Sequence, residues 1–352
     1  MVTMENKLLD ELISDQKKIS DFYKPSKYWL KKTLSASREI KKNGLNDFRS
    51  SSGDNTAATA FGDNTIIDAR RIVETNSIQN KIGLAMLEHT ALKRLFDFQV
   101  NTTKGLLKTV LELEKNKLVQ TNPERLAKLI QKYNIENSVN FGCDRITKFE
   151  NKEYSTLYLE ILDLLDVIES NLTLKGLHSL LEIGPGFGAN VHLIEQNFPE
   201  LRKFVITDIV PNIWIVTEYL RHLYGKSVKD YLVTKNMKEI KFMEDNSLEI
   251  FIVPPWQIEK ISSSIDCFWN SNSFVEMSPE IVKNYAEKLK KNMTEKTRYN
   301  FTSYDRFDLK TTFHPDQIID CFSDVTFNKL EYPMLTNSER KNFFYLGKIV
   351  GN

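Results

Sequence analysis

Three glycines within five residues mark the part of this chain best suited to bind a ligand. They are Gly184, Gly186 and Gly188, in the run Leu-Glu-Ile-Gly-Pro-Gly-Phe-Gly (181–188), although the whole chain has only 13 glycines among 352 residues. Glycine lets a backbone turn tightly and approach a ligand with no Cβ in the way. Because an apolar run (179–183) precedes them and a helical pattern follows, we predict a strand–loop–helix whose free N–H groups face a ligand.

An acidic residue 20 positions after the last of these glycines points to a nucleoside ligand. Asp208 follows the next predicted strand, 203–207, and a carboxylate there can accept hydrogen bonds from both ribose hydroxyls. The spacing, with Ala189, also satisfies the dinucleotide fingerprint. However, Glu182 stands where dinucleotide folds keep an apolar residue, and the third glycine comes one position early. A tight structural turn with a solvated aspartate is the remaining alternative.

The pattern E-x-G-x-G-x-G resembles the first motif of Rossmann-like methyltransferases, and the chain is similar to the bacterial sugar O-methyltransferases. The resemblance implies a class I methyltransferase fold, an α/β doubly wound sheet with an α-helical N-terminal extension. It also implies S-adenosyl-L-methionine as cofactor and a sugar hydroxyl of a surface glycan as acceptor. The resemblance is best over residues 180–290, where it rests on the runs 181–188, 205–211 with 218–220, and 269–277. Looser matches lie at 28–30 and 46–49.

The resemblance also implies where the cofactor would lie. Its methionine end would contact the glycine-rich loop, and its ribose would contact the end of the second strand (203–207). Its adenine would lie beside the loop after the third strand (248–253). Trp256 could stack on adenine or fill the sheet edge. Many methyltransferases bind the adenine amino group with an acidic residue after the third strand, and here Gln257 or the backbone would replace it. Asn270 could cap a turn instead of contacting the cofactor. The predicted cofactor-binding residues are Glu182, Gly184, Pro185, Gly186, Gly188, Asn190, Asp208, Ile209, Pro254, Trp256 and Asn270.

A sugar hydroxyl needs a base to take its proton while the methyl group transfers. Glu276 is our first candidate, because it follows the fourth predicted strand (265–269) and side chains at strand ends face the crevice of such sheets. Burial there would raise its pKa toward neutrality. Alternatively, Glu276 stabilises the N-terminus of the helix that begins near Ser278.

His314 is the second candidate base, because an imidazole titrates near neutral pH. Alternatively, His314 lies in a solvated loop at the start of a helix and has no catalytic role. Asp305 and Asp308 could hold Mg²⁺, but an Asp-x-x-Asp pattern is common in loops, and we predict no metal site.

The elements that position these residues fall into two regions. Residues 1–150 read as a helical region that acts as a lid, an acceptor-binding part or an oligomer contact, and 151–352 as the Rossmann-like domain. The polar run 49–65 is a plain loop or a lid. Predicted helices are 4–19, 27–42, 66–98, 105–118, one beginning at 122–124, 154–170, 188–196, 211–224 and one beginning at 278; predicted strands are 179–183, 203–207, 248–253, 265–269, 298–303, 325–330 and 343–350. This alternation predicts a parallel doubly wound sheet.

Composition narrows the function classes. Lys and Arg number 48 against 47 Asp and Glu, so no overall field favours nucleic acid or an anionic membrane. No transmembrane segment or signal peptide is apparent, and a cytoplasmic protein, possibly a homo-oligomer, is expected. Alternatives to the methyltransferase are an NAD(P)-dependent oxidoreductase and a catalytically silent glycan-assembly scaffold. Three cysteines lie too far apart in sequence to suggest a zinc site or a disulfide framework: Cys143, Cys267 and Cys321.

Overall fold

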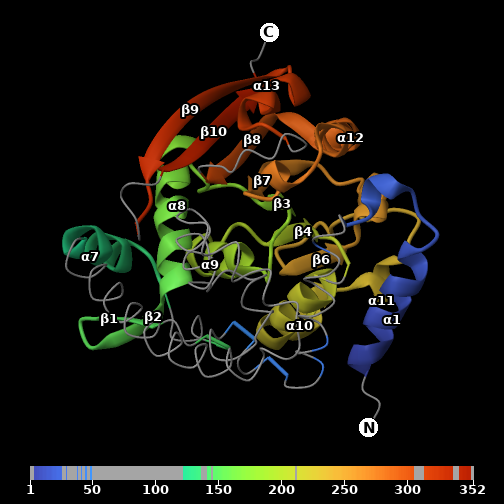
Figure 1. The fold of residues 1–352 in the computed structure, drawn as a ribbon, viewed down its shortest axis with the longest axis horizontal. Helices are drawn as coiled ribbons and strands as arrows, with labels where there is room; N and C mark the ends of the chain where they lie inside the picture. The colour runs from blue at the N-terminus through green and yellow to red at the C-terminus, as the bar shows by residue number, and fades with distance from the viewer. Residues whose placement is uncertain are drawn as a thin grey trace, which may run out of the picture.

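An eight-stranded sheet forms the centre of the computed structural model (Figure 1). The structure describes residues 4–25, 29, 38, 41, 44–45, 48–49, 122–135, 141–143, 146–210, 212–304, 313–335 and 341–349. The strands, in spatial order, are β5 (Val228–Lys229), β6 (Glu249–Val253), β4 (Lys203–Thr207), β3 (Ser179–Ile183), β7 (Ile265–Ser271), β8 (Met293–Tyr304), β10 (Lys341–Ile349) and β9 (Val325–Pro333). From β3 the chain adds strands first on one side and then on the other, so the sheet is doubly wound, as predicted.

One strand departs from the predicted parallel arrangement. Strands β3 to β8 pair in parallel, whereas β10 pairs antiparallel with both β8 and β9. Only residues 334–340 separate β9 from β10, and a parallel pair would need a crossover of a dozen or more residues. The short connection therefore forces the reversal.

Helices cover both faces of the sheet. Leu180 belongs to an apolar cluster with helices α8, α9 and α10, whereas Leu181 belongs to a second cluster with α12. Successive strand residues point to opposite faces, so both faces of β3 are buried. The helices are α8 (Thr156–Leu172), α9 (Ala189–Asn197), α10 (Asn212–Tyr224), α11 (Tyr231–Thr234), α12 (Pro279–Leu289) and α13 (Ile318–Cys321); short 3₁₀ turns are η3 (Gly225–Ser227), η4 (Pro255–Lys260), η5 (Phe274–Glu276), η6 (Lys290–Asn292) and η7 (Pro315–Gln317).

The described part of the N-terminal region is mainly helical. It contains α1 (Met4–Gln16), the turn η1 (Asp21–Tyr23) and α7 (Pro123–Lys132). Figure 1 shows α1 beside α11 at one side of the molecule and α7 at the other, beyond α8. Leu8 and Leu12 of α1 are buried in the apolar cluster that also covers β3. The predicted helices 66–98 and 105–118 and most of the loop 49–65 lie outside the described residues.

A hairpin that the sequence pattern does not predict lies at the boundary between the predicted regions 1–150 and 151–352. It joins β1 (Ile146–Phe149) to β2 (Lys152–Ser155). Glu150 and Asn151 both have positive φ, as in the tight turns of hairpins, but they lack the Asn-Gly signature that would predict such a turn. Helix α8 therefore begins at Thr156 and not at residue 154.

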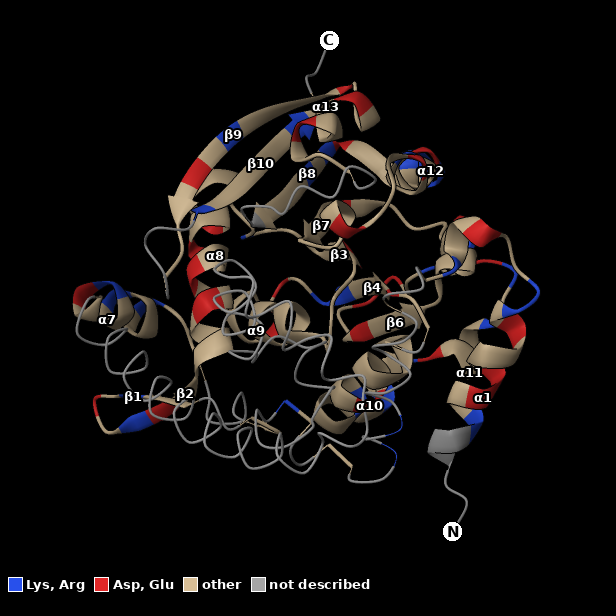
Figure 2. Ribbon diagram, in the orientation of Figure 1, with Lys and Arg blue, Asp and Glu red and all other residues tan. Residues whose placement is uncertain are grey.

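The outer helices carry both acidic and basic residues. Figure 2 shows acidic and basic positions mixed along α7 and α12. Among the described residues, no helix has the length and apolar character needed to cross a membrane.

Candidate functional site

The glycine-rich loop follows β3 and has three left-handed residues. Gly184, Gly186 and Gly188 have φ of +75°, +61° and +99°, a region that side chains other than glycine rarely adopt. A Cβ on Gly184 would lie 2.3 Å from the Cβ of Ser273, and one on Gly188 would lie 3.0 Å from Leu220. A Cβ on Gly186 would have no atom within 4 Å. Packing thus explains two of the glycines, and the third faces open space that a ligand can use.

Glu182 is a buried acid within β3. Its Oε1 accepts a hydrogen bond from Asn190 Nδ2 at 2.6 Å, while its Oε2 is buried and has no hydrogen-bond partner among the described residues. The pKa of Glu182 is raised to about 8: burial raises it most, the Asn190 hydrogen bond lowers it, and the charge of Asp208 raises it. A buried oxygen without a donor is costly, so this carboxyl is suited to accept a hydrogen bond from a water or a ligand.

Asp208 lies at the end of β4 and joins the loop. Its Oδ1 accepts hydrogen bonds from Ile209 N at 2.7 Å and Asn212 Nδ2 at 3.4 Å, and the N–H of Gly186 also donates to the carboxyl. The pKa of Asp208 is raised to about 7: burial raises it most, the three hydrogen bonds lower it, and the charge of Glu276 raises it. The aspartate predicted to bind ribose therefore lies beside the open glycine.

Glu276 comes from a third strand end. It closes the turn η5 after β7, where its N–H donates to Ser273 O at 3.1 Å. The charge of Glu276 contributes to the raised pKa of Asp208. The acid in the first turn of α12 is Glu280, and Glu276 lies three residues before that helix. Its role as a base stays a prediction.

Asn270, at the end of β7, is fully buried and closes the turn. Its Nδ2 donates to Ile183 O at 2.9 Å and to Ser273 Oγ at 2.6 Å, and its Oδ1 accepts from Phe274 N at 3.2 Å. These are the contacts expected if Asn270 caps the turn, and they hold β7 against the end of β3. A cofactor contact for Asn270 stays a prediction.

The loop after β6, which is predicted to lie beside adenine, packs against Tyr231 and Thr234 of α11. Pro254 is buried, and the indole of Trp256 meets the ring of Tyr231 edge to face at 5.8 Å. Gln257 is buried, with Oε1 accepting from Thr234 Oγ1 at 2.8 Å and Nε2 donating to Thr234 O at 3.0 Å. Thr234 therefore engages both ends of this amide. The adenine contacts of Trp256, and of Gln257 or the backbone, stay predictions.

His314 caps a helical turn. Its side chain is 70% exposed, its Nδ1 accepts from Asp316 N at 3.3 Å, and its N–H donates to Gln317 Oε1 at 2.7 Å. The preceding Phe313 is buried, and its N–H donates to Met277 O at 2.8 Å. The imidazole thus has a structural contact, and its catalytic role stays a prediction. Asp305 and Asp308 lie outside the described residues.

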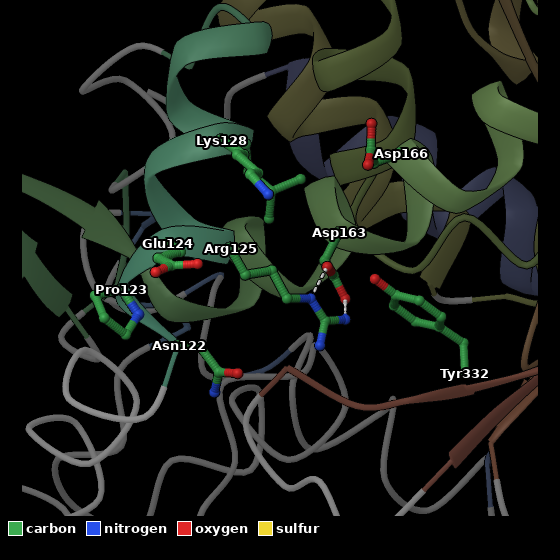
Figure 3. Close-up of a pocket in the computed structure, with 9 residues that line it drawn as sticks. Asn122, Pro123, Glu124, Arg125, Lys128, Asp163, Asp166 and Tyr332 are labelled. Atoms are coloured by element: carbon green, nitrogen blue, oxygen red, sulfur yellow. Dashed lines mark hydrogen bonds and ion pairs between the residues drawn. The ribbon is translucent and has the colours of Figure 1, made fainter.

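A cavity of about 650 Å³ lies apart from these residues, between α7, α8 and the end of β9 (Figure 3). Inside it, Arg125 forms a two-point ion pair with Asp163, donates to Pro333 O at 3.2 Å and covers the ring of Tyr332 at 4.5 Å. These interactions hold α7 against α8 and β9. None of the cavity's lining residues belongs to the predicted site.

No protein-family model matches the chain, and no curated protein matches it in sequence. Among solved structures, it is similar to a SAM-dependent methyltransferase from Aquifex aeolicus, at 14% identity and a TM-score of 0.39 over 55% of this chain and 94% of that one. It is also similar to the pyocyanin biosynthetic protein PhzM, at 10% identity and a TM-score of 0.38 over 55% of this chain and 57% of that one.

A third similar structure is Burkholderia thailandensis 1,6-didemethyltoxoflavin-N1-methyltransferase, which holds 1,6-didemethyltoxoflavin and S-adenosylhomocysteine. Its identity is 10% and its TM-score 0.36, over 53% of this chain and 76% of that one. The strand order identifies the fold: a Rossmann-like, doubly wound α/β sheet with a mainly helical N-terminal extension.

Proposed function

We propose that the protein is an S-adenosyl-L-methionine-dependent O-methyltransferase acting on a sugar hydroxyl of a bacterial surface glycan or its precursor. The observation that supports it most directly is the open space beside Gly186, whose φ is +61° and whose N–H donates to the buried carboxyl of Asp208. Glu182, near the end of β3, adds a buried carboxyl oxygen that has no hydrogen-bond partner among the described residues. This arrangement suits a nucleoside that carries an ammonium group.

The residues at the strand ends fit this cofactor. Glu182 has a buried oxygen able to accept a hydrogen bond, directly or through water, from the ammonium group of the methionine end. Asp208 can accept both ribose hydroxyls. The dinucleotide fingerprint has an apolar residue where this chain has Glu182, and its third glycine comes one position later than Gly188. These two differences favour the methyltransferase over the oxidoreductase.

The bound cofactor supplies a methyl group on a positively charged sulfur. The residues at the strand ends would hold the acceptor hydroxyl next to that methyl, and positioning of this kind supplies much of the rate. The carboxylate of Glu276 would take the hydroxyl proton as the methyl is transferred. His314 is the alternative acceptor of that proton. The sugar acceptor itself follows from the family resemblance.

The test uses methyl-labelled S-adenosyl-L-methionine with bacterial glycans and nucleotide sugars, and mass spectrometry to locate the methyl group. We expect label on a sugar oxygen for the wild-type protein. An Asp208→Asn variant should lose about tenfold or more of its affinity for S-adenosylhomocysteine, because a charged hydrogen-bond acceptor for ribose is lost. Asp320→Asn, an exposed change on α13, serves as the control.

Three outcomes would count against the proposal in different ways. Binding of NAD without binding of S-adenosylhomocysteine would favour the oxidoreductase. Binding of S-adenosylhomocysteine without transfer to any acceptor would favour the catalytically silent scaffold. Label on a nitrogen or on a non-sugar oxygen would keep the methyltransferase and remove the sugar acceptor.

A further inference from the structure

The carboxyl of Asp208 has most of its hydrogen-bonding capacity taken up by the protein itself. Its Oδ1 accepts from Ile209 N at 2.7 Å and from Asn212 Nδ2 at 3.4 Å, and the N–H of Gly186 donates to the same carboxyl. An ionised carboxylate offers about four lone-pair directions to donors. These three N–H groups therefore leave about one direction open for a ligand.

The ribose of an adenosine ligand brings two neighbouring hydroxyl groups, and each of them is a donor. The sequence pattern predicts that Asp208, at the end of β4, accepts both. With about one direction open, its carboxyl can accept one hydroxyl without displacing an N–H group of the protein. The other hydroxyl needs a second acceptor close to the first.

Asn212, the first residue of α10, has such an acceptor. Only 6% of this residue is exposed, and its Oδ1 is buried with no hydrogen-bond partner among the described residues. A buried carbonyl oxygen that lacks a donor is costly. This oxygen is therefore suited to accept a hydrogen bond from a bound ligand.

The position of this oxygen follows from the bond that the other end of the amide makes. Asn212 Nδ2 donates to Asp208 Oδ1, and Asn212 Oδ1 belongs to the same planar amide group. Because Asp208 Oδ1 also accepts from Ile209 N, the reverse orientation of the amide would place two acceptor oxygens against each other. Asn212 Oδ1 therefore lies beside the carboxyl that contacts the N–H of the open glycine, Gly186.

We propose that Asn212 Oδ1 is the second acceptor for the ribose of the cofactor, so that one hydroxyl binds to Asp208 and the other to Asn212. The inference rests on the proposed function and refines the assignment of both hydroxyls to Asp208. Because a hydrogen bond joins the two side chains, they present their acceptor oxygens together, as a pair that fits a cis diol. A ligand with a deoxyribose leaves one of the two acceptors unpaired.

Calorimetry on the wild-type protein tests whether both hydroxyls are bound. The ligands are S-adenosylhomocysteine and its 2′-deoxy and 3′-deoxy analogues. One analogue should bind about 10- to 100-fold more weakly, because it loses a bond to a charged acceptor, and the other about 3- to 10-fold more weakly, because it loses a bond to a neutral one. Full affinity for either analogue would overturn the inference. Failure to bind any of the three ligands would instead remove the proposed function.

An Asn212→Leu variant tests which side chain accepts the second hydroxyl. Leucine is similar in shape to asparagine and occupies the place of the amide, but it offers no acceptor. The analogue that lacks the hydroxyl bound by Asn212 should now bind as tightly as S-adenosylhomocysteine, while the other analogue keeps its deficit. Unchanged deficits for both analogues, or loss of both deficits, would show a merely structural role for Asn212 and overturn the inference.

Asn292→Leu is the matched control. Asn292 is also buried, its Oδ1 also lacks a hydrogen-bond partner among the described residues, and its Nδ2 donates to Ile261 O at 2.9 Å. It precedes β8, so it lies at the opposite edge of the parallel strands from Asn212, which follows β4. This variant should keep both deficits of the wild type. Loss of a deficit in Asn292→Leu would mean that the deficits report the stability of the fold and not a contact with ribose, and it would overturn the inference.

Discussion

Glu182 holds its proton more tightly in the folded chain than in the unfolded one. Its pKa is raised from 4.5 to about 8, mainly by burial. Because the folded pKa is the higher one, its contribution to stability is complete below about pH 4.5 and is lost as the pH rises through 8. At neutral and alkaline pH, burial of this carboxyl therefore lowers the free energy of unfolding. Strongly shifted pKa values of this kind are typical of functional carboxyls.

We expect Glu182→Gln to remove this pH dependence. The amide keeps the shape of the side chain and an oxygen for Asn190 Nδ2, but it cannot ionise. Relative to the wild type, the variant should gain free energy of unfolding as the pH rises from 5 to 8. Urea unfolding at several pH values measures this difference, with Glu200→Gln, an exposed change, as the control. An unchanged slope between wild type and Glu182→Gln would contradict the raised pKa.

Glu276 and His314 are separable by mutation. Glu276→Gln should reduce turnover about 10²- to 10⁴-fold, the usual effect of losing a general base, while affinity for S-adenosylhomocysteine stays near normal. His314→Ala should retain most of its turnover, because that imidazole is 70% exposed and caps η7. Initial rates and calorimetry on both variants check the prediction. A large loss in His314→Ala alone would transfer the role of base to the histidine.

At the scale of elements, helix α1 supports the loop predicted to contact adenine. Asp15 Oδ2 accepts a hydrogen bond from Tyr231 Oη at 2.9 Å, and the ring of Tyr231 contacts Trp256. Glu11 pairs with Lys235 at 2.7 Å on the same side of the molecule. The N-terminal helix thus belongs to the structure around the site.

Because α1 is packed into the main apolar cluster, it should unfold together with the sheet. Leu12 is fully buried, and Leu12→Ala should lower the free energy of unfolding by about 2–5 kcal/mol through lost burial and the cavity left behind. Ser14→Ala, an exposed change in the same helix, should change it by less than about 0.5 kcal/mol. Urea denaturation measures both. A small effect of Leu12→Ala would mean that α1 frays independently of the sheet.

At the scale of the whole molecule, a ligand that binds only the folded state raises its stability. S-adenosylhomocysteine at a hundredfold excess over Kd should add about 2.7 kcal/mol and raise the melting temperature. NAD at the same concentration should leave the melting temperature unchanged, because Glu182 and the position of Gly188 depart from the dinucleotide fingerprint. Thermal unfolding followed by circular dichroism makes the comparison. The reverse result would favour an oxidoreductase.

Local patterns in the sequence were sufficient to predict the centre of the fold. The bounds of β3 and β4 match the predicted 179–183 and 203–207, because central strands are continuous apolar runs ended by glycine or a polar residue. The positions of Gly186 and Asp208 at strand ends follow from the same runs. The hairpin β1–β2 was missed because its turn at Glu150 and Asn151 lacks the usual residue types.

Contacts between distant parts of the chain decided the rest. The amide of Gln257 is engaged by Thr234, and that of Asn270 closes a turn against Ile183, so neither side chain's partners could be read from its neighbours in sequence. Arg49 reaches Phe187 only because the N-terminal extension packs on the sheet. Sequence periodicity specifies which face of an element is buried, but only tertiary packing specifies which distant residue meets that face.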